Sequence, residues 1–292
     1  NDAVVDIVGG TITLSANAGI GVGLGGSLDL NGGTINASTS LAGAGIYLTE
    51  EDGATLGSIT TNNGPVEVSA TAGSLTIGSI NAGTGNVTLS ADAAGGTIVD
   101  DVNDAVVDIV GGTITLSANA GIGVGPGGSL DFGAVTAINA STTDGSIALN
   151  GANNDLPATS ITAGGGGDIT LTTTGSGDIQ LGLIDATGDL VTLNSAGSIT
   201  DDRVGVNVIA DTLDATATTG IGVTAPSNEL ETTVNNLNAT TVTGGIGISN
   251  TGALKVDGAS VTGASGDITI TSSGPQTIAG DVTAPGNVTL QA

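Results

Sequence analysis

Apolar and polar residues alternate with a period of two along short stretches of this chain. In residues 11–16, TITLSA, the side chains of Ile12, Leu14 and Ala16 fall on one face, and the hydroxyl side chains fall on the other. Such alternation predicts a β-strand with one buried face. Clusters of Gly, Asn and Asp separate these stretches and supply the positive-φ turns between strands. No window keeps the 3.6-residue period of a helix, so we expect an all-β protein.

The sequence repeats itself over a long period. Residues 1–23 recur without change at 103–125, and a diverged third copy at 199–223 resembles residues 98–124. The long period, or super-repeat, is therefore about 100 residues. Because the chain begins and ends partway through this period, we interpret it as an internal fragment of a longer protein.

A shorter period lies inside the long one. A signature of Gly, a polar residue, an aliphatic residue and a polar residue returns as GSIT at 57, GSIN at 78, GSIA at 145, GDIT at 167, GSIT at 197 and GDIT at 266. The spacing predicts units of about 20–22 residues, each with two or three short strands. Such strands cannot bury a face alone, but coils of a parallel β-helix stacked on one another enclose a common aliphatic column. A β-sandwich or propeller is the weaker alternative, because the units are too short for four strands.

We therefore predict one continuous β-solenoid over residues 1–292, with super-repeat boundaries near residues 102 and 202 and no linker. The stretch around Glu50, Glu51 and Asp52 fits the coil pattern least. We expect a loop that leaves the stack there.

Charge and composition exclude several classes of function. The chain has 28 acidic residues against Arg203 and Lys255, a formal net charge of -26, and neither Cys nor His. This charge repels nucleic acid and anionic lipid and attracts cations. Without Cys or His, a thiol nucleophile, a Ser-His-Asp triad or an ordinary zinc site cannot be assembled. No run of 18 apolar residues occurs, so we expect no membrane insertion.

Several strings resemble a known family. GSITDDR, TLDATATTGIGV, NELETTVNNLNATT and GGIGISNTGAL are similar to repeats of the filamentous-haemagglutinin-like large exoproteins of Gram-negative bacteria, and the similarity is clearest over residues 186–257. The resemblance covers essentially the whole chain. It implies a right-handed β-helix, secretion to the cell surface, and a role as a fibrous adhesin or biofilm component.

A dinucleotide-binding pattern occurs by spacing alone. Gly21, Gly23 and Gly26 match G-x-G-x-x-G, and the match recurs one super-repeat later. That motif binds pyrophosphate only where it opens a helix. Residues 27–30, SLDL, are instead typical of a strand, so we interpret the glycines as close packing at a coil corner.

Two acidic pairs, Asp100-Asp101 and Asp201-Asp202, return at the same place in the super-repeat. The favoured interpretation is a turn device, because Asp side chains hydrogen-bond their own backbone at corners. Weakly bound calcium at these four residues is the alternative, and no other cofactor is expected. The second pair, with Arg203, is also the best local candidate for polysaccharide-processing chemistry. We predict no catalytic residue and no enzyme, because the first pair lacks the arginine.

The expected function is structural: a stiff extracellular spacer of a bacterial surface or secreted adhesin, whose partners are other copies of itself through coil-to-coil or end-to-end association. The alternative is an adhesive module that binds a carbohydrate or a host-surface receptor. Aromatic residues suit sugar stacking, and Tyr47 and Phe132 are the only two in the chain. Tyr47 is the place where a sugar site is expected under this alternative.

Overall fold

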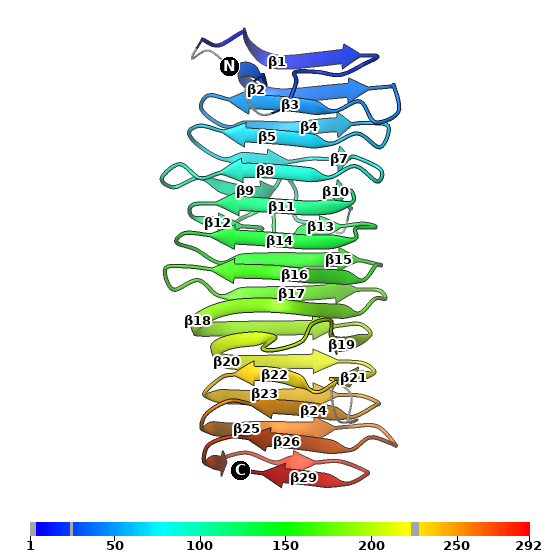
Figure 1. The fold of residues 1–292 in the computed structure, drawn as a ribbon, viewed down its shortest axis with the longest axis vertical. Coiled ribbons are helices and arrows are strands. Elements are labelled where there is room, and N and C mark those ends of the chain that lie inside the picture. Colours follow the sequence, from blue (N-terminus) through cyan, green and yellow to red (C-terminus); the bar gives the residue numbers. More distant parts are fainter. Residues whose placement is uncertain (1–3, 24–25, 105, 223–227) are drawn as a thin grey trace. The chain divides into compact units, whose positions relative to one another are not determined.

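The computed structural model describes residues 4–23, 26–104, 106–222 and 228–292. The chain divides into two compact units, residues 1–152 and 153–292, and each is described by itself. All described residues lie in strands, turns or irregular segments, and none of them is helical (Figure 1). The prediction of an all-β parallel β-solenoid is confirmed, with about 13 turns and coils that stack about 22 residues apart. Among the described residues there is consequently no helix that could cross a membrane.

The strands of the first unit are β1 (Ile7–Ala16), β2 (Leu28–Thr39), β3 (Ile46–Glu50), β4 (Ala54–Thr60), β5 (Val66–Ala70), β6 (Leu75–Ile77), β7 (Ile80–Asn81), β8 (Val87–Ala91), β9 (Thr97–Asp100), β10 (Ile109–Val110), β11 (Thr113–Ala118), β12 (Gly121–Ile122), β13 (Leu130–Phe132), β14 (Ala137–Thr142) and β15 (Ile147–Ala152).

The strands of the second unit are β16 (Leu156–Ala163), β17 (Ile169–Thr174), β18 (Ile179–Ser195), β19 (Ser198–Asp201), β20 (Val208–Ala217), β21 (Gly220–Ile221), β22 (Leu230–Thr233), β23 (Asn236–Thr241), β24 (Ile246–Asn250), β25 (Leu254–Val261), β26 (Ile268–Ser272), β27 (Gln276–Ile278), β28 (Val282–Thr283) and β29 (Val288–Gln291).

The strands pair in parallel with strands one turn before or after them in the chain. In the first unit β5 pairs with β8, β6 with β9 and β7 with β10, so one turn contributes three strands to the wall of the solenoid. The second unit follows the same rule, for example where β24 pairs with β26 and β26 with β29. Parallel pairing requires a crossover between strands, and here the rest of the coil supplies it.

Aliphatic side chains at equivalent places in successive turns form buried columns. One column of the first unit consists of Ile46, Val66, Val87, Ile114 and Ile138, which pair in that order. None of these side chains is more than 1% exposed. Burying one such side chain contributes about 1.5–3 kcal/mol, so the columns are the main source of stability in each coil. As the alternation in the sequence predicts, every second side chain of these strands points into the interior of the coil.

The second unit has a matching column. Leu156, Ile179, Ile199, Ile221 and Ile246 pair in that order, and all of them are fully buried. Both units thus bury one face of their short strands in columns of aliphatic side chains, although their sequences have diverged.

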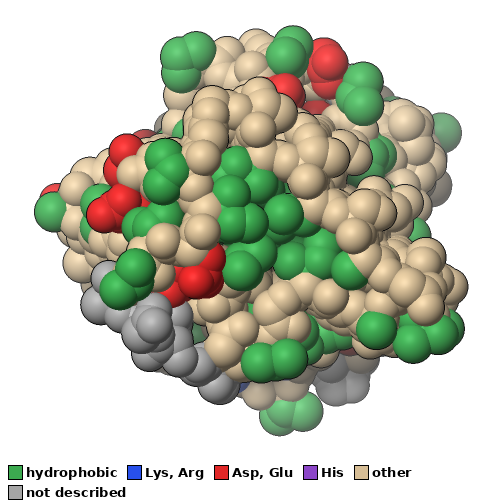
Figure 2. Space-filling view, turned by 90° about the horizontal axis from the view of Figure 1, so that it is seen from above, with side chains coloured by type: hydrophobic (Ala, Val, Ile, Leu, Met, Phe, Trp, Pro, Cys, Tyr) green, Lys and Arg blue, Asp and Glu red, His purple; other side chains and the backbone are tan. Residues whose placement is uncertain are grey.

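Apolar side chains fill the inside of the coil. Figure 2 looks onto the end of the first unit at β1, where apolar side chains gather in the middle and the backbone and other side chains surround them. Of the side chains of β1, that of Ile12 is buried, at 5% exposure. The space enclosed by the strands is therefore a packed apolar core.

The glycines of the dinucleotide-like pattern lie at coil corners, as predicted. Gly21 and Gly123 occupy the same place in the two identical segments and have φ angles of 66° and 63°. A Cβ at Gly123 would overlap the carbonyl oxygen of Ala148 in the next turn. The strand that follows Gly26 begins at Leu28, so no helix is present to bind a pyrophosphate there.

The expectation of a loop at Glu50 is wrong. Glu50 ends β3 and is fully buried, and its carboxylate accepts hydrogen bonds from the backbone N–H groups of Gly32, Asp52 and Gly53, at 2.7, 2.8 and 2.6 Å. The acidic run is a tight corner that stays in the stack, because the inward carboxylate satisfies three backbone donors at once.

Candidate functional site

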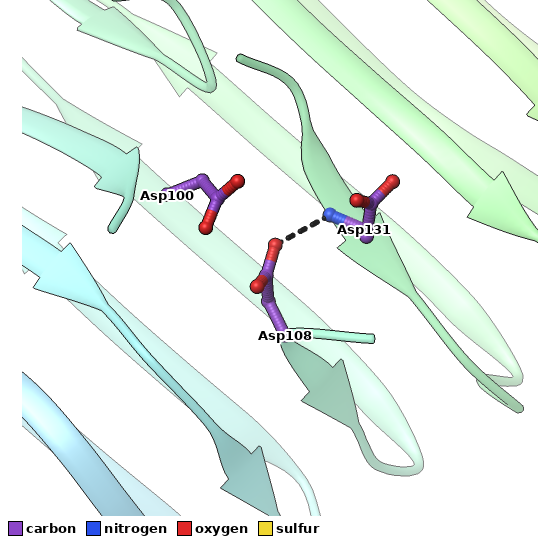
Figure 3. A group of neighbouring side chains, drawn as sticks. All are labelled: Asp100, Asp108 and Asp131. Carbon is purple, nitrogen blue, oxygen red and sulfur yellow. Dashed lines mark hydrogen bonds between the residues drawn. The ribbon is translucent and has the colours of Figure 1, made fainter. Parts of the chain in front are cut away.

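Three aspartates from different parts of the first unit meet in one buried cluster. Asp100 ends β9, Asp108 precedes β10, and Asp131 lies in the middle of β13. They are 4%, 3% and 1% exposed. One carboxylate oxygen of each lies within 4.8 Å of the others. Figure 3 shows the side chains of Asp100 and Asp108 pointing toward each other, with Asp131 beside them. We call these three residues the acidic cluster.

An excursion of the chain between β9 and β10 brings the first two aspartates together. Residues 101–104 and 106 are exposed, and the chain returns to the wall at Asp108. Ile109 consequently pairs with Ile80, 29 positions earlier, where other coils advance by about 22. Asp100 and Asp108, which lie on either side of these exposed residues, are both buried.

Backbone hydrogen bonds fix the geometry of the cluster. The N–H of Asp108 donates to the carbonyl oxygen of Asp131 at 2.8 Å, and the N–H of Asp131 donates to Oδ2 of Asp108 at 2.7 Å. The N–H of Val102 donates to Oδ1 of Asp100 at 3.2 Å. The side-chain amide of Asn150 donates to Oδ1 of Asp131. Each carboxylate is therefore held by at least one donor.

Burial raises the pKa of all three carboxyl groups of the cluster. Desolvation raises the pKa of Asp108 to about 8, and the charges of Asp100 and Asp131 add to the effect. Burial also raises the pKa of Asp100, and it raises that of Asp131 despite the hydrogen bond from Asn150. The sequence of residues 1–152 contains no Lys or Arg, so no basic side chain of this unit offsets the charge. Such a site can take up a proton or a cation.

Two of the three positions of the acidic cluster have counterparts in the first copy of the repeat. The N–H of Asp6 donates to the carbonyl oxygen of Asp29 at 2.8 Å, and the N–H of Asp29 donates to Oδ2 of Asp6 at 3.0 Å. Asp6 corresponds to Asp108 and Asp29 to Asp131 in the repeated sequence. Asp6 is exposed, so this copy is not a closed site.

The third copy, in the second unit, contains an amide where the cluster has its central carboxyl. The N–H of Asn207 donates to the carbonyl oxygen of Glu231 at 2.7 Å, and the N–H of Glu231 donates to Oδ1 of Asn207 at 2.9 Å. The Asn207 amide then donates to Oδ1 of Asp201 at 2.7 Å and to the carbonyl oxygen of Leu181 at 3.1 Å. Asn207 therefore satisfies Asp201 without a cation or an extra proton.

The four aspartates predicted from the sequence have different environments. Asp100 belongs to the acidic cluster, and Asp201 belongs to the amide-containing third copy. Asp101 and Asp202 are exposed beside them. Oδ1 of Asp201 accepts the N–H of Arg203 at 2.9 Å, which matches the bond from Val102 to Asp100 and agrees with the turn-device interpretation.

The sequence prediction missed Asp108 and Asp131. It considered aspartates adjacent in the chain, whereas these two are 23 residues apart, one coil along the stack. Asp6 and Asp29 have the same spacing. The signal that could have found them is an acidic residue repeated at the coil period rather than at neighbouring positions.

Tyr47, considered as a sugar-stacking residue, is half-buried in β3. Its ring covers Gly45, which directly precedes β3, and Gly23, which lies between β1 and β2: a Cβ placed on either glycine would lie against the ring. An aromatic side chain that covers glycines in this way stabilises the strand pairing locally. The ring is therefore partly occupied by the protein itself.

No family model, no curated protein and no solved structure matches the chain. The resemblance to filamentous-haemagglutinin-like exoproteins accordingly stays an expectation.

Proposed function

We propose that this chain is a structural element, a stiff spacer made of stacked coils in a bacterial surface or secreted adhesin. The observation that carries the proposal is the repetition of one coil plan. Two reciprocal hydrogen bonds, one between backbone groups and one from a backbone N–H to a side-chain oxygen, join Asp108 to Asp131 in the first unit and Asn207 to Glu231 in the second. When each super-repeat begins at the same position of a coil, further repeats can be added to the stack, and their number sets the length of the scaffold.

The charge distribution supports a spacer. A formal net charge of -26 makes parallel copies repel one another side to side. The lone described ion pair joins Lys255 to Asp257 at 2.5 Å, and both side chains are about half exposed, at 50% and 40%. Such a pair adds little stability. The scaffold therefore depends on its core columns and its backbone ladders.

The buried polar groups described above also support a structural role. Glu50 accepts hydrogen bonds from backbone N–H groups of the coil. Asn207 donates to a backbone carbonyl and to a neighbouring side chain. Among the described residues, the acidic cluster is the one group of His, Cys, Asp or Glu side chains close enough to share a metal ion. It lies inside the wall rather than in a groove on the surface, where a polysaccharide substrate would bind.

Negative-stain electron microscopy and circular dichroism of the purified chain test this proposal. We expect thin, unbranched particles with a β spectrum, and end-to-end chains of particles at high protein concentration. A binding screen against a panel of oligosaccharides, run on the same preparation, addresses the adhesive alternative. Compact round particles, or saturable sugar binding that a Tyr47→Ala substitution abolishes, would overturn the spacer role.

A further inference from the structure

Two carboxylate oxygens of the acidic cluster have no hydrogen-bond donor. Oδ2 of Asp100 and Oδ2 of Asp131 are both buried, and neither has a partner. Their residues are 4% and 1% exposed. A buried polar oxygen without a donor is costly, and an anionic one more so. The two oxygens belong to the same cluster as the Asp108 carboxyl, so a single positively charged ligand can serve all three groups.

The dimensions of the cluster fit a calcium ion. Calcium binds oxygen at about 2.3–2.6 Å, so two ligands on opposite sides of it lie about 5 Å apart. One carboxylate oxygen from each of the three residues lies within 4.8 Å of the others, a separation that one calcium ion can bridge. Magnesium demands near-ideal octahedral geometry at about 2.0–2.1 Å, whereas calcium accepts irregular sets of six to eight oxygens. Zinc prefers nitrogen and sulfur ligands, and the chain has neither His nor Cys.

The third copy supplies an internal comparison. There Asn207 occupies the place of Asp108, removes one negative charge and donates to Asp201 at 2.7 Å. The amide thus performs the task that a cation would perform between the carboxylates of the first unit. The two copies keep the same backbone bonds and differ in how the charge is balanced.

We propose that Asp100, Asp108 and Asp131 bind one calcium ion inside the wall of the first unit. Both unpartnered oxygens and the Asp108 carboxylate coordinate it, and water completes the shell. The ion enters past the exposed excursion at residues 101–104. This site lies at the end of the coil that carries Asp100-Asp101, and it is distinct from scattered binding at exposed acidic corners. It does not depend on the spacer function.

Isothermal titration of the full chain with calcium chloride, after treatment with a chelator and in about 0.15 M salt to screen weak surface binding, tests the site. We expect one calcium per chain with a dissociation constant of about 10⁻³ M or tighter, the range of extracellular calcium modules. The variant Asp108→Asn copies the chemistry of Asn207 and should fold, because the second unit already carries that residue. It should weaken binding at least about tenfold.

The variant Asp101→Asn is the matched control. It removes the same charge from the neighbouring exposed position and should leave the binding constant within about twofold. Thermal unfolding gives a second readout: saturating calcium should raise the Tm of the wild-type chain and of Asp101→Asn by several degrees, but not that of Asp108→Asn. Absence of a saturable site below about 10 mM, or equal weakening by both substitutions, would show that calcium meets only the diffuse surface charge and would overturn the proposal.

Discussion

Asp108 and Asp131 hold each other through two hydrogen bonds in opposite directions. The backbone N–H of Asp108 donates to the carbonyl oxygen of Asp131, and the backbone N–H of Asp131 donates to the side chain of Asp108. The side chain thereby takes the place of a backbone acceptor at the point where the chain returns from its excursion. An aspartate and an asparagine can both accept this bond, which explains why Asn207 serves equally well in the second unit.

The first prediction concerns the central residue of the cluster. In metal-free protein, Asp108→Asn should raise the free energy of unfolding of the first unit by about 1–3 kcal/mol, because an amide replaces a buried carboxyl that lies against two others. Urea unfolding in the presence of EDTA, with Asp101→Asn as the control, measures the change. A variant less stable than the wild type under these conditions would contradict the account of charge crowding.

The reverse change is expected to have the opposite sign. Asn207→Asp removes the amide that donates to Asp201 and to the carbonyl of Leu181, and it adds a buried negative charge beside Asp201 and Glu231. Burial and the charge of Asp201 already raise the pKa of Glu231. We expect a loss of about 1–3 kcal/mol in the free energy of unfolding at neutral pH, again measured with urea in EDTA. No loss would mean that the amide contributes nothing to the coil.

The pH dependence of stability follows from the raised pKa of Asp108. A carboxyl whose pKa is raised on folding stabilises the fold fully below its unfolded value, 3.8, and loses that contribution as the pH rises through its folded value, about 8. The carboxyls that face it, Asp100 and Asp131, have pKa values raised in the same direction. The metal-free chain should therefore lose stability between about pH 4 and pH 8.

The measurement is the urea midpoint at pH 5 and pH 8 in EDTA, for the wild type and for Asp108→Asn. The wild-type midpoint should be lower at pH 8, and the difference should shrink in the variant. A wild-type midpoint that rises from pH 5 to pH 8, or an equal fall in the two proteins, would contradict the assignment of the raised pKa to Asp108.

Glu50 gives a prediction about a carboxylate that is well satisfied. Glu50→Ala leaves the N–H groups of Gly32, Asp52 and Gly53 without their acceptor, and it should cost about 2–4 kcal/mol. Glu51→Ala is the control, because Glu51 is exposed and accepts one bond, from the Asn31 side chain at 2.7 Å. Chemical denaturation compares them. Equal small effects would restore the expectation of a loop outside the stack.

The core columns give a prediction that uses one substitution at two places. Val87→Ala removes two methyl groups from a fully buried column and should cost about 2–3 kcal/mol. Val8→Ala makes the same change on a side chain that is 75% exposed, and it should cost no more than about 0.5 kcal/mol. Thermal or urea unfolding distinguishes them. Similar costs would mean that Val87 does not point into the wall.

Much of the fold could be predicted from the sequence, because a solenoid repeats its local pattern. The alternation at residues 11–16 lies in β1, and the GSIT signature at residue 57 completes β4. Strand, turn and core position are all local properties when every coil packs on a copy of itself. The coil length followed from the same repetition.

The acidic residues could be predicted only in part, because their burial depends on how coils stack. The repeated acidic pair identified Asp100. Its partners were missed because Asp108 follows the exposed residues after Asp100, and Asp131 lies in the next coil. Glu50 was misplaced because three acidic residues in a row suggest solvent exposure. Its inward direction depends on three backbone N–H groups that no sequence pattern marks.

The central claim, that successive super-repeats begin at equivalent positions of the coil, is tested most directly by deleting one super-repeat. Deletion of residues 100–200 joins Val99 to Asp201, which occupies the place of Asp100 in the next copy. Deletion of residues 100–210 removes ten more residues and joins the coils out of phase. Circular dichroism and urea unfolding of both variants give the result.

The account predicts that the in-phase variant keeps a β spectrum and unfolds cooperatively, because each coil still pairs with an equivalent neighbour. The out-of-phase variant should lose cooperativity. If both deletions disrupt folding equally, or if both variants unfold with the same cooperativity, the coil plan described here is contradicted.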